Sequence, residues 1–240
     1  MRPSSSRTSD RIREGGLIHV PPPVANNERI ADREARLRML HAEMTACQRC
    51  VAAGYLRAAS SVAGYRGRAS DQVMIVGQAP GRLSAERGKP FSGPSGKTLD
   101  LWLQQAGFPS GALYTHVYLS ALTKCDPGKA AKGKGDRKPS PPELALCRPF
   151  LERELDLVRP RAILLVGTMA IEAFLGPMRL DDAVGQAFER NGALLLPLPH
   201  PSGVSRWLND AEHQRRVQKV LELLADRKRE WEKETFSSAS

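Results

Sequence analysis

Short apolar runs alternate with helical patterns along this chain, and no other feature restricts the fold as much. Two runs, 72–76 and 162–166, each stop at a glycine, and two further candidate strands cover 113–122 and 193–198. Helical patterns lie beside and between them, over 27–46, 95–105, 143–158, 168–175 and 213–231. Strands and helices in alternation predict a parallel sheet with helices on both faces.

The 240 residues leave room for one large domain with tails. The stretch 1–25, rich in Ser and Arg, predicts a disordered tail, 26–235 a single folded domain and 236–240 a second short tail. No apolar run approaches the roughly 20 residues that cross a bilayer, and the first residues lack the apolar centre of a secretory signal. We therefore expect a soluble, cytoplasmic protein with no membrane association.

The chain has four cysteines, with Cys47 and Cys50 in a C-x-x-C pair and Cys125 and Cys147 far downstream. Four thiolates suit either a tetrahedral zinc ion or an iron–sulfur cluster, and their number does not choose between the two. Two disulfides are the alternative, but they need an oxidising compartment, for which the sequence shows no signal. The pattern favours one four-thiolate metal site.

A formal net charge of +10 and a pI of about 9.8 are large for a chain of this length. Such an excess of positive charge favours an anionic partner, and nucleic acid is the commonest such polymer. A protein that is merely basic is the alternative interpretation.

Glycine-rich turns follow the first predicted strand, at the edge of a parallel sheet where ligands bind. The segment G-Q-A-P-G at 77–81 comes first, and a second glycine-rich turn surrounds one aromatic residue, Phe91. Glycines let the backbone approach a ligand closely. A phosphate-binding loop is the rival interpretation, but the G-K-T at 96–98 lacks the glycine five positions earlier, where Phe91 stands.

A histidine follows the fourth predicted strand. His200 lies between Pro199 and Pro201, which restrict the backbone around it. Its position after a strand places the imidazole at the same ligand edge of the sheet. A structural role is the alternative for any single histidine, but this location makes His200 our candidate catalytic residue.

The order of these motifs resembles that of the iron–sulfur uracil-DNA glycosylases, and most of all family 4. C-x-x-C is followed by G-Q-A-P-G, G-K-P-F-x-G at 88–93, a strand ending in Lys124-Cys125, C-R-P-F-L at 147–151 and His200-Pro201-Ser202. Each motif is weak alone, but their order and spacing together are specific. The match covers about 47–224, which is most of the chain.

The resemblance implies a fold, a cofactor and a reaction. The implied fold is a three-layer α/β/α sandwich around a four-stranded parallel sheet. The implied cofactor is a [4Fe–4S] cluster on Cys47, Cys50, Cys125 and Cys147, in place of zinc. The implied reaction is hydrolysis of the N-glycosidic bond of deoxyuridine in DNA, which releases uracil and leaves an abasic site. On this basis 26–235 is the domain of a monofunctional glycosylase of base-excision repair.

By the same resemblance, His200 and Gln78 are the catalytic residues. A uracil flipped out of the DNA stacks on Phe91, for which ordinary core packing is the alternative. His200 donates a hydrogen bond to uracil O2 as negative charge develops on the base, while Gln78 helps to place the attacking water. The other residues expected to contact the substrate are Gly77, Ala79, Pro80, Gly81, Ser120, Ala121 and Ser202.

Two departures from family 4 bear on the chemistry. The family usually reads G-E-A-P-G with further carboxylates just after it, whereas this chain has Gln78 and no acidic residue before Glu86. Gln78 can orient water without fully accepting its proton, and Glu86 is the alternative base. The family's uracil-reading asparagine falls at Ala121, whose side chain cannot pair with a base. The candidates to replace it are Ser120, Thr123, Asn209 and a backbone group.

The segment 126–140 is longer than we expect for family 4, and it is strongly basic. It is either a mobile, solvated insertion or a clamp on DNA phosphates. A related branch of the family traps the sugar covalently through a histidine in a longer loop here. Since this loop has no histidine, we expect turnover or tight non-covalent product binding. The DNA contacts that we assign are Lys129, Lys132, Lys134, Arg137 and Lys138, with Val204 as a wedge in the base stack and Arg206 on phosphate.

The expected partner is uracil-containing DNA, single- or double-stranded, bound by a monomer at the nucleoid. The rival function is a non-catalytic iron–sulfur binder of damaged or single-stranded DNA, left after loss of the carboxylate and the asparagine. A zinc-braced nucleic-acid module is a third interpretation, and it predicts a colourless protein.

Overall fold

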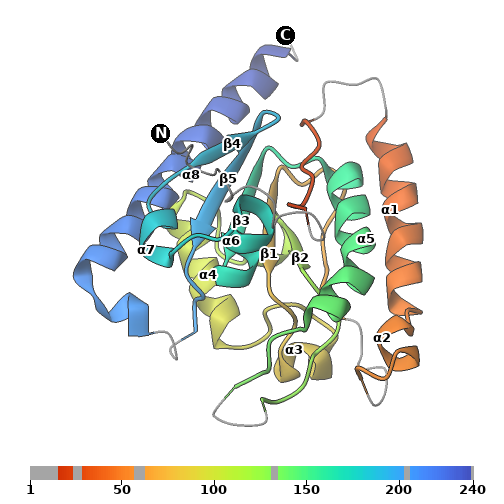
Figure 1. The fold of residues 1–240 in the computed structure, drawn as a ribbon. Coiled ribbons are helices and arrows are strands. Elements are labelled where there is room, and N and C mark those ends of the chain that lie inside the picture. The colour runs from red at the N-terminus through yellow and green to blue at the C-terminus, as the bar shows by residue number, and fades with distance from the viewer. Residues whose placement is uncertain (1–15, 24–28, 57–62, 131–134, 203–205, 239–240) are drawn as a thin grey trace, which may run out of the picture.

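The computed structural model describes residues 16–23, 29–56, 63–130, 135–202 and 206–238, with side chains as far as 234. Within these residues a five-stranded sheet has the order β2-β1-β3-β5-β4 (Figure 1). The strands are β1 (Val73–Gly77), β2 (Tyr118–Ala121), β3 (Ala162–Val166), β4 (Phe188–Arg190) and β5 (Ala193–Leu198).

The four predicted strands are all present and run parallel, which confirms the predicted fold class. β1 pairs with β2 on one side and with β3 on the other, and β3 pairs with β5. The described residues contain one strand more than the expected four, because β4 adds to β5 in antiparallel direction. Asn191 and Gly192 form the turn between them, both with positive φ, as a two-residue hairpin turn requires.

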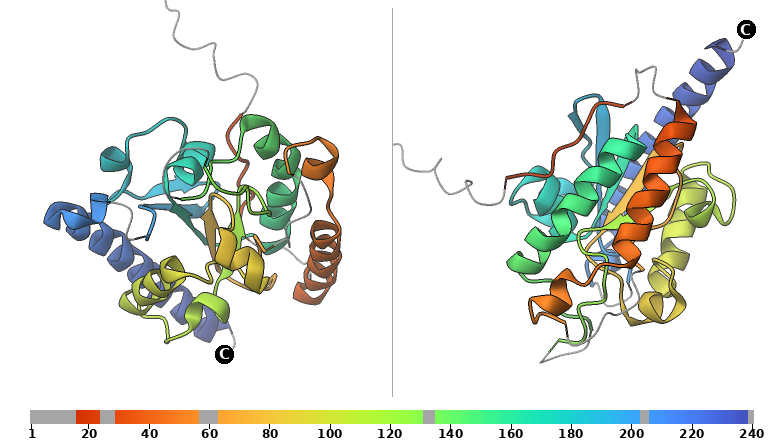
Figure 2. Two further views of the ribbon diagram at one scale, coloured as in Figure 1. Left: turned by 90° about the horizontal axis from the view of Figure 1, so that it is seen from below. Right: turned by 90° about the vertical axis from the view of Figure 1, so that its right-hand side faces the viewer.

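Both faces of the sheet are covered, and this explains why its strands are uninterrupted apolar runs. Successive residues of β1 point to opposite faces, so that Met74 and Val76 join one hydrophobic core while Val73 and Ile75 join the other. The helices on the first face are α1 (Ile30–Thr45), α5 (Pro141–Val158) and α6 (Thr168–Leu175), and those on the second are α4 (Pro94–Gln105) and α8 (Ala211–Ser238). The resulting three layers are visible in Figure 2.

Short helices connect these elements, and the sequence patterns did not predict them. In the described residues they are α2 (Arg49–Ala52), α3 (Arg82–Arg87), α7 (Leu180–Ala183) and the 3₁₀ helices η1 (Ala112–Tyr114) and η2 (Arg206–Asn209). Each is too short to show a helical period of apolar residues. The helix η1 occupies the start of the candidate strand 113–122, so that β2 is shorter than expected.

The segment 16–23 packs on the domain, although it falls within the stretch expected to be a disordered tail. Ile18 and Val20 are buried in the core of the first face, and the Ile18 N–H donates to the carbonyl oxygen of Ala173 at 2.9 Å. Arg148 of α5 donates to the carbonyl oxygens of Gly16 and Leu17. The remainder of the predicted tail, 1–15 and 24–25, lies outside the described residues.

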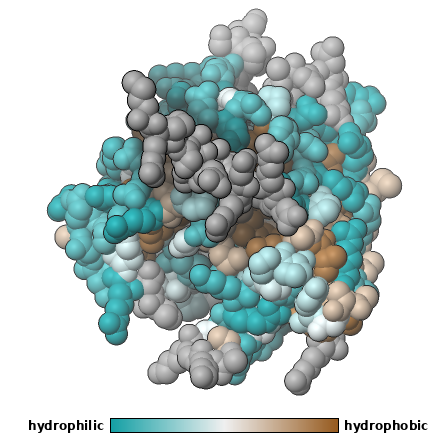
Figure 3. Space-filling view, viewed as in Figure 1, coloured by the Kyte–Doolittle hydropathy of each residue, from teal (hydrophilic) through white to brown (hydrophobic). Residues whose placement is uncertain are grey.

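Hydrophilic residues predominate on the face seen in Figure 3, and hydrophobic ones gather toward its middle. A cavity of about 360 Å³ lies between the segment 16–23, α5 and α6, with Ile18, Leu144 and Met169 among its lining residues. Of the helices in the described residues, none combines the length and the apolar character that crossing a bilayer requires.

Candidate active site

A cavity of about 420 Å³, here called the base pocket, opens at the carboxyl ends of the strands. Gln78 follows β1, Ser120 and Ala121 end β2, His200 follows β5, and all four line this space. The other expected substrate contacts that line it are Ala79, Pro80, Gly81 and Phe91. The fold thus brings together residues that stand far apart in the sequence, at the sheet edge where parallel folds bind ligands.

Phe91 forms one wall of the base pocket and is held in an unusual backbone conformation. Its φ of 51° lies in the left-handed region, which bulky residues rarely adopt. The Tyr114 hydroxyl donates to its carbonyl oxygen at 3.0 Å, and the same oxygen occupies the place of any side chain at Gly96. The ring lies against Gly77, where an added Cβ would meet it at 3.0 Å. The two glycines therefore permit the close packing that fixes the ring.

His200 also lines the base pocket, and its hydrogen bonds fix the tautomer of its ring. The backbone N–H of Ser202 donates to His200 Nδ1 at 3.3 Å, and Ser202 Oγ lies 2.9 Å from the same nitrogen. Since a backbone N–H can only donate, Nδ1 is an acceptor and the neutral ring carries its proton on Nε2. The residue borders solvent, but the protein packed around its ring lowers the pKa of His200 below 6.5, which Asp136 partly offsets. Ser202 and Gly77 support the pocket without being among its lining residues.

A buried polar network lies under Ser120. Glu154 of α5 accepts hydrogen bonds from the hydroxyls of Tyr118 (2.9 Å) and Ser120 (2.8 Å). Lys124 pairs with Glu154 at 2.6 Å, and the side chains of this ion pair are 2% and 0% exposed. Lys124 also donates to Ser120 Oγ and to the carbonyl oxygen of Ala121. The Ser120 hydroxyl is therefore engaged as both donor and acceptor, and it is not free to replace an amide at Ala121.

The other two side chains that were candidates for base reading lie elsewhere. Thr123 lines the cavity of the cysteines, where its Oγ1 is buried with no hydrogen-bond partner in the described residues. Asn209 belongs to η2 and is not among the residues that line the base pocket. Among the described lining residues, Gln78 carries the one amide side chain.

The base pocket also contains a carboxylate that the sequence motifs did not indicate. Asp136 comes from the insertion 126–140, and its Oδ2 lies 2.6 Å from the position of a Cβ added to Gly81. Glu86, the alternative base, pairs with Arg82 on α3 and does not line the pocket. An aspartate among glycines and lysines is usually solvated, so the sequence offered no signal for Asp136.

All four cysteines line a second, much smaller cavity of about 20 Å³, here called the cysteine cavity. Cys47 and Cys50 lie at α2, Cys125 follows β2, and Cys147 is in the second turn of α5. All four are free thiols, so the disulfide alternative is not seen. Burial raises the pKa of Cys147 to about 11 and also raises that of Cys50. Four neighbouring thiols in an apolar setting suit a metal that would hold them as thiolates.

The thiols surround one space without standing at metal-bonding separations. In the part of the chain that the structure describes, no group of three or more His, Cys, Asp and Glu side chains is placed to hold a metal ion. Four cysteine thiols that line one cavity are a donor set of the kind that binds zinc or an iron–sulfur cluster as thiolates.

The basic residues assigned to DNA differ in their surroundings. Lys129 and Lys138 are exposed, and so is Arg206 of η2. Arg137 instead donates to both carboxylate oxygens of Glu143 at 2.7 Å, which ties the insertion to α5. Lys132, Lys134 and Val204 lie outside the described residues.

A basic groove next to the base pocket was missed in the sequence. It has a volume of about 620 Å³, shares Gly93 with the base pocket, and is lined by Arg87, Lys89 and Lys97. The Lys89 ammonium lies 3.4 Å from the centre of the Tyr114 ring. Three cations within eleven residues around Phe91 were the available signal.

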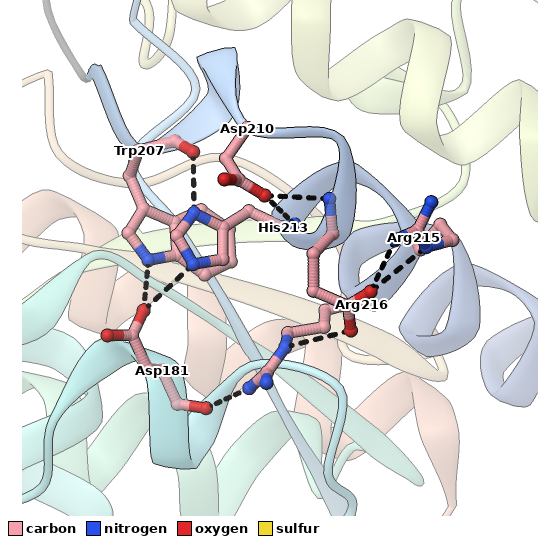
Figure 4. A network of polar contacts seen from close by, with 7 residues as sticks. Asp181, Trp207, Asp210, His213, Arg215 and Arg216 are labelled. Carbon is pink, nitrogen blue, oxygen red and sulfur yellow. Dashed lines mark hydrogen bonds and ion pairs between the residues drawn. The ribbon is translucent and has the colours of Figure 1, made fainter.

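A polar network anchors the chain shortly after His200 (Figure 4). The rings of Trp207 and His213 stack at 4.0 Å with an interplanar angle of 4°. Asp181 accepts a hydrogen bond from Trp207 Nε1 at 2.6 Å and lies 3.2 Å from His213 Nε2. Arg216 donates to the carbonyl oxygen of Asp181, and Asp210 accepts from two N–H groups at the start of α8. These contacts join η2, α7 and α8.

Fold and pocket together define an α/β ligand-binding domain with its site at the carboxyl edge of the sheet. A family model described as "Uracil DNA glycosylase superfamily" matches residues 65–225, more than half of the chain. The chain belongs to this superfamily.

Three curated relatives give the scale of the similarity. The "Type-4 uracil-DNA glycosylase" of Pyrobaculum aerophilum is 30% identical over 158 residues, which cover 64% of this chain and 74% of that protein. The protein of the same name from Thermotoga maritima is 27% identical over 193 residues, covering 79% of this chain and 92% of the relative. The "Type-5 uracil-DNA glycosylase" of Pyrobaculum aerophilum is 29% identical over 145 residues, covering 55% and 61%.

Proposed function

We propose that this protein hydrolyses the N-glycosidic bond of deoxyuridine in DNA, releases uracil and leaves an abasic site. The observation that carries the proposal is the base pocket, which is lined by both Phe91 and His200. An aromatic face stacks a flipped base, and a fixed donor stabilises the charge that the base acquires as it leaves. Superfamily membership and relatives named uracil-DNA glycosylase support the same reaction.

The proposed reaction requires the Phe91 ring, the His200 imidazole and one water molecule. As the bond between C1′ and the base breaks, negative charge spreads over the uracil, including O2. The Nε2–H of His200 donates to this oxygen, and a neutral ring keeps its proton there while the hydrogen bond strengthens. The water oxygen then bonds to C1′ and the water loses a proton, while the uracil anion gains one as it leaves.

Base recognition falls to Gln78 in this proposal. Its amide offers one donor and one acceptor, the pair that the O4 and N3–H of uracil require. Ala121 brings no polar side-chain atom, and Ser120 is engaged with Glu154 and Lys124. Because a glutamine side chain has one more rotatable bond than asparagine and holds its amide less firmly, we expect discrimination between uracil and other deaminated bases to be weaker than an asparagine at 121 would give.

We further propose that Cys47, Cys50, Cys125 and Cys147 hold a [4Fe–4S] cluster. Such a cluster would supply a structural cross-link among α2, the end of β2 and α5. The cysteine cavity supports the assignment because four thiols from three distant segments share it. DNA would lie over the pocket mouth, held by phosphate contacts from exposed residues such as Lys129, Lys138 and Arg206.

The decisive experiment is uracil release from labelled oligonucleotides by the purified, brown protein. Single- and double-stranded substrates containing uracil, hypoxanthine or xanthine would be compared with matched undamaged DNA. Alkali-labile sites at uracil support the proposal. Retained DNA binding without release of any base would contradict it and favour a non-catalytic lesion binder. A colourless but active protein would contradict the cluster alone.

A further inference from the structure

The base pocket has no carboxylate in the motif at 77–81, but it receives one from the insertion. We propose that Asp136 is the general base that takes a proton from the water attacking C1′. This inference rests on the proposed glycosylase function and adds a catalytic residue to it. It also gives the insertion 126–140 a chemical role beside any contact with DNA phosphates.

The backbone around Asp136 is held in place from both sides. Lys129 and Asp136 form an antiparallel bridge, supported by hydrogen bonds from the Ala130 N–H to Gly135 and from the Arg137 N–H to Gly128. The Gly128 N–H in turn donates to Asp126 Oδ1 at 2.8 Å. The two described ends of the insertion are therefore paired with each other beside the base pocket.

The residue after Asp136 ties this pair to the domain. The Arg137 guanidinium donates to both oxygens of Glu143 at 2.7 Å and to the carbonyl oxygen of Tyr55 at 3.3 Å. Glu143 also accepts from the backbone N–H and the hydroxyl of Ser140, at the start of α5. With its neighbour anchored in this way, Asp136 belongs to the built wall of the pocket.

Gly81 provides the room for the Asp136 carboxylate. The backbone of Gly81, with φ −87° and ψ 175°, is one that any residue can adopt, so its conformation does not require glycine. A Cβ at this position would instead stand 2.6 Å from Asp136 Oδ2, inside van der Waals contact. The last glycine of the motif G-Q-A-P-G and the carboxylate from the insertion therefore fit each other.

The carboxylate is free to accept a proton. Among the described residues, no hydrogen bond or ion pair engages it. Asp136 is exposed to solvent on one side, but the protein packed around its carboxylate and the charge of Asp126 raise its pKa above 3.8. The positive charges of Arg82, Lys129 and a protonated His200 act in the opposite direction. A raised pKa brings the group nearer to the pH at which a general base works best.

The step balances without any further reactant. The C1′–N1 bond breaks and its electron pair remains on the uracil, which accepts the hydrogen bond from His200. The water oxygen forms the new bond to C1′, and the proton it loses moves to a carboxylate oxygen of Asp136. Asp136 later returns this proton to solvent, and uracil is protonated as it leaves.

The test compares Asp136→Asn with Glu86→Gln in single-turnover uracil release from about pH 4 to pH 8. Glu86 is the matched control because it is the nearest carboxylate after the motif, and it does not line the pocket. A general base must be ionised, so the wild-type rate should fall as the pH drops through the raised pKa of Asp136. Asp136→Asn should be slower by about 10²-fold and should lose this acidic limb, while Glu86→Gln keeps both the rate and the limb.

A double-mutant cycle with Gly81→Ala provides a second measurement. The methyl group displaces the carboxylate, so Gly81→Ala alone should slow release by about tenfold, whereas in the Asp136→Asn background it should change the rate much less. Equal effects in both backgrounds would show that Gly81 acts independently of Asp136, and this would overturn the inference.

The outcomes separate the inference from the proposed function. If wild type and Glu86→Gln release uracil and folded Asp136→Asn does so at an unchanged rate and with an unchanged pH profile, the function stands and the role of Asp136 is refuted. If wild type releases no base, both fall together. Equal thermal midpoints and equal DNA affinity for Asp136→Asn exclude a loss of folding or of binding as the cause.

Discussion

The cysteine cavity and the base pocket lie at the same end of the sheet but are built in different ways. The cysteine cavity gathers one residue type from three segments and has a volume of about 20 Å³. The base pocket has a volume of about 420 Å³. It combines an aromatic ring, an amide, an imidazole and a carboxylate. In our proposal the cysteine cavity holds three segments of the fold together, and the base pocket carries out the reaction. Substitutions should therefore affect stability in one region and rate in the other.

Removal of a cysteine should have the largest effect. Cys147→Ser takes one of four thiols from a buried position, and a cluster with a missing ligand would no longer join α5 to α2 and the end of β2. We expect loss of the absorption near 400 nm typical of such clusters and loss of most folded protein, since metal binding of this kind contributes directly to folding. Ultraviolet–visible spectra and thermal unfolding would measure both.

Thr123→Val is the matched control in the same cavity. It removes a buried hydroxyl that has no partner in the described residues while keeping the shape of the side chain. Colour and stability should be retained or slightly improved. A folded, colourless and fully active Cys147→Ser would contradict the structural role of the cluster.

Between the two regions lies the Lys124–Glu154 pair, whose disruption should have the next largest effect. Glu154→Gln leaves the Lys124 charge buried without a counterion, and breaking a pair of this kind costs about 3–5 kcal/mol. Urea unfolding would measure the loss. Glu43→Gln on α1, which breaks the exposed pair with Arg153 of α5, should leave the unfolding free energy nearly unchanged. Similar losses in both variants would show that burial of the pair is not what matters.

His200→Ala should slow the reaction without loosening the fold. Removing one donor to a developing oxyanion typically lowers the rate by about 10²–10³-fold. Single-turnover release would show the loss, while the colour and the thermal midpoint stay at their wild-type values. The exposed His116, which bonds to Thr115 and does not line the pocket, provides the control substitution. An unchanged rate for His200→Ala would remove His200 from the mechanism.

Phe91→Leu should have the smallest effect, on substrate affinity. Leucine keeps apolar bulk but loses the flat face, and stacking of a base on an aromatic ring contributes about 1–3 kcal/mol. Binding of a uracil-containing oligonucleotide, measured in the slow His200→Ala background, should weaken accordingly. Phe108→Leu, on the α4 and α8 side of the sheet, should leave this affinity unchanged. Equal affinities for both variants would assign Phe91 to packing alone.

The elements that the sequence predicted are those with a long regular pattern. Four strands and the helices α1, α4, α5, α6 and α8 confirm the expected segments. Burial of one stripe leaves a helical period in the residues, and burial of both faces of a strand leaves an uninterrupted apolar run. β4 was missed because three partly exposed residues carry no such period, although the Asn191-Gly192 turn beside it was a readable hairpin signal.

The residues of the site also differ in how well the sequence predicted them. Gln78, Phe91 and His200, which the sequence assigned to the site, all line the base pocket, and each stands in a glycine or proline motif that follows a predicted strand. Asp136 was not, since its place depends on how the insertion folds back over Gly81, a long-range contact that no local pattern records. The engagement of Arg137 by Glu143 was equally hidden, and it gives this residue, which the sequence assigned to DNA, an anchoring contact within the domain.

The packing of 16–23 has a practical consequence for anyone who shortens this protein. A version that begins at residue 26, where composition suggests the domain starts, would lack Ile18 and Val20, both at most 4% exposed. Each such side chain contributes about 1.5–3 kcal/mol to the free energy of unfolding by its burial. The shortened domain would therefore be less stable, and it would expose an apolar surface beside α5 and α6. Poor solubility of such a version would then reflect the loss of the segment 16–23, and a version that starts at residue 16 keeps this segment.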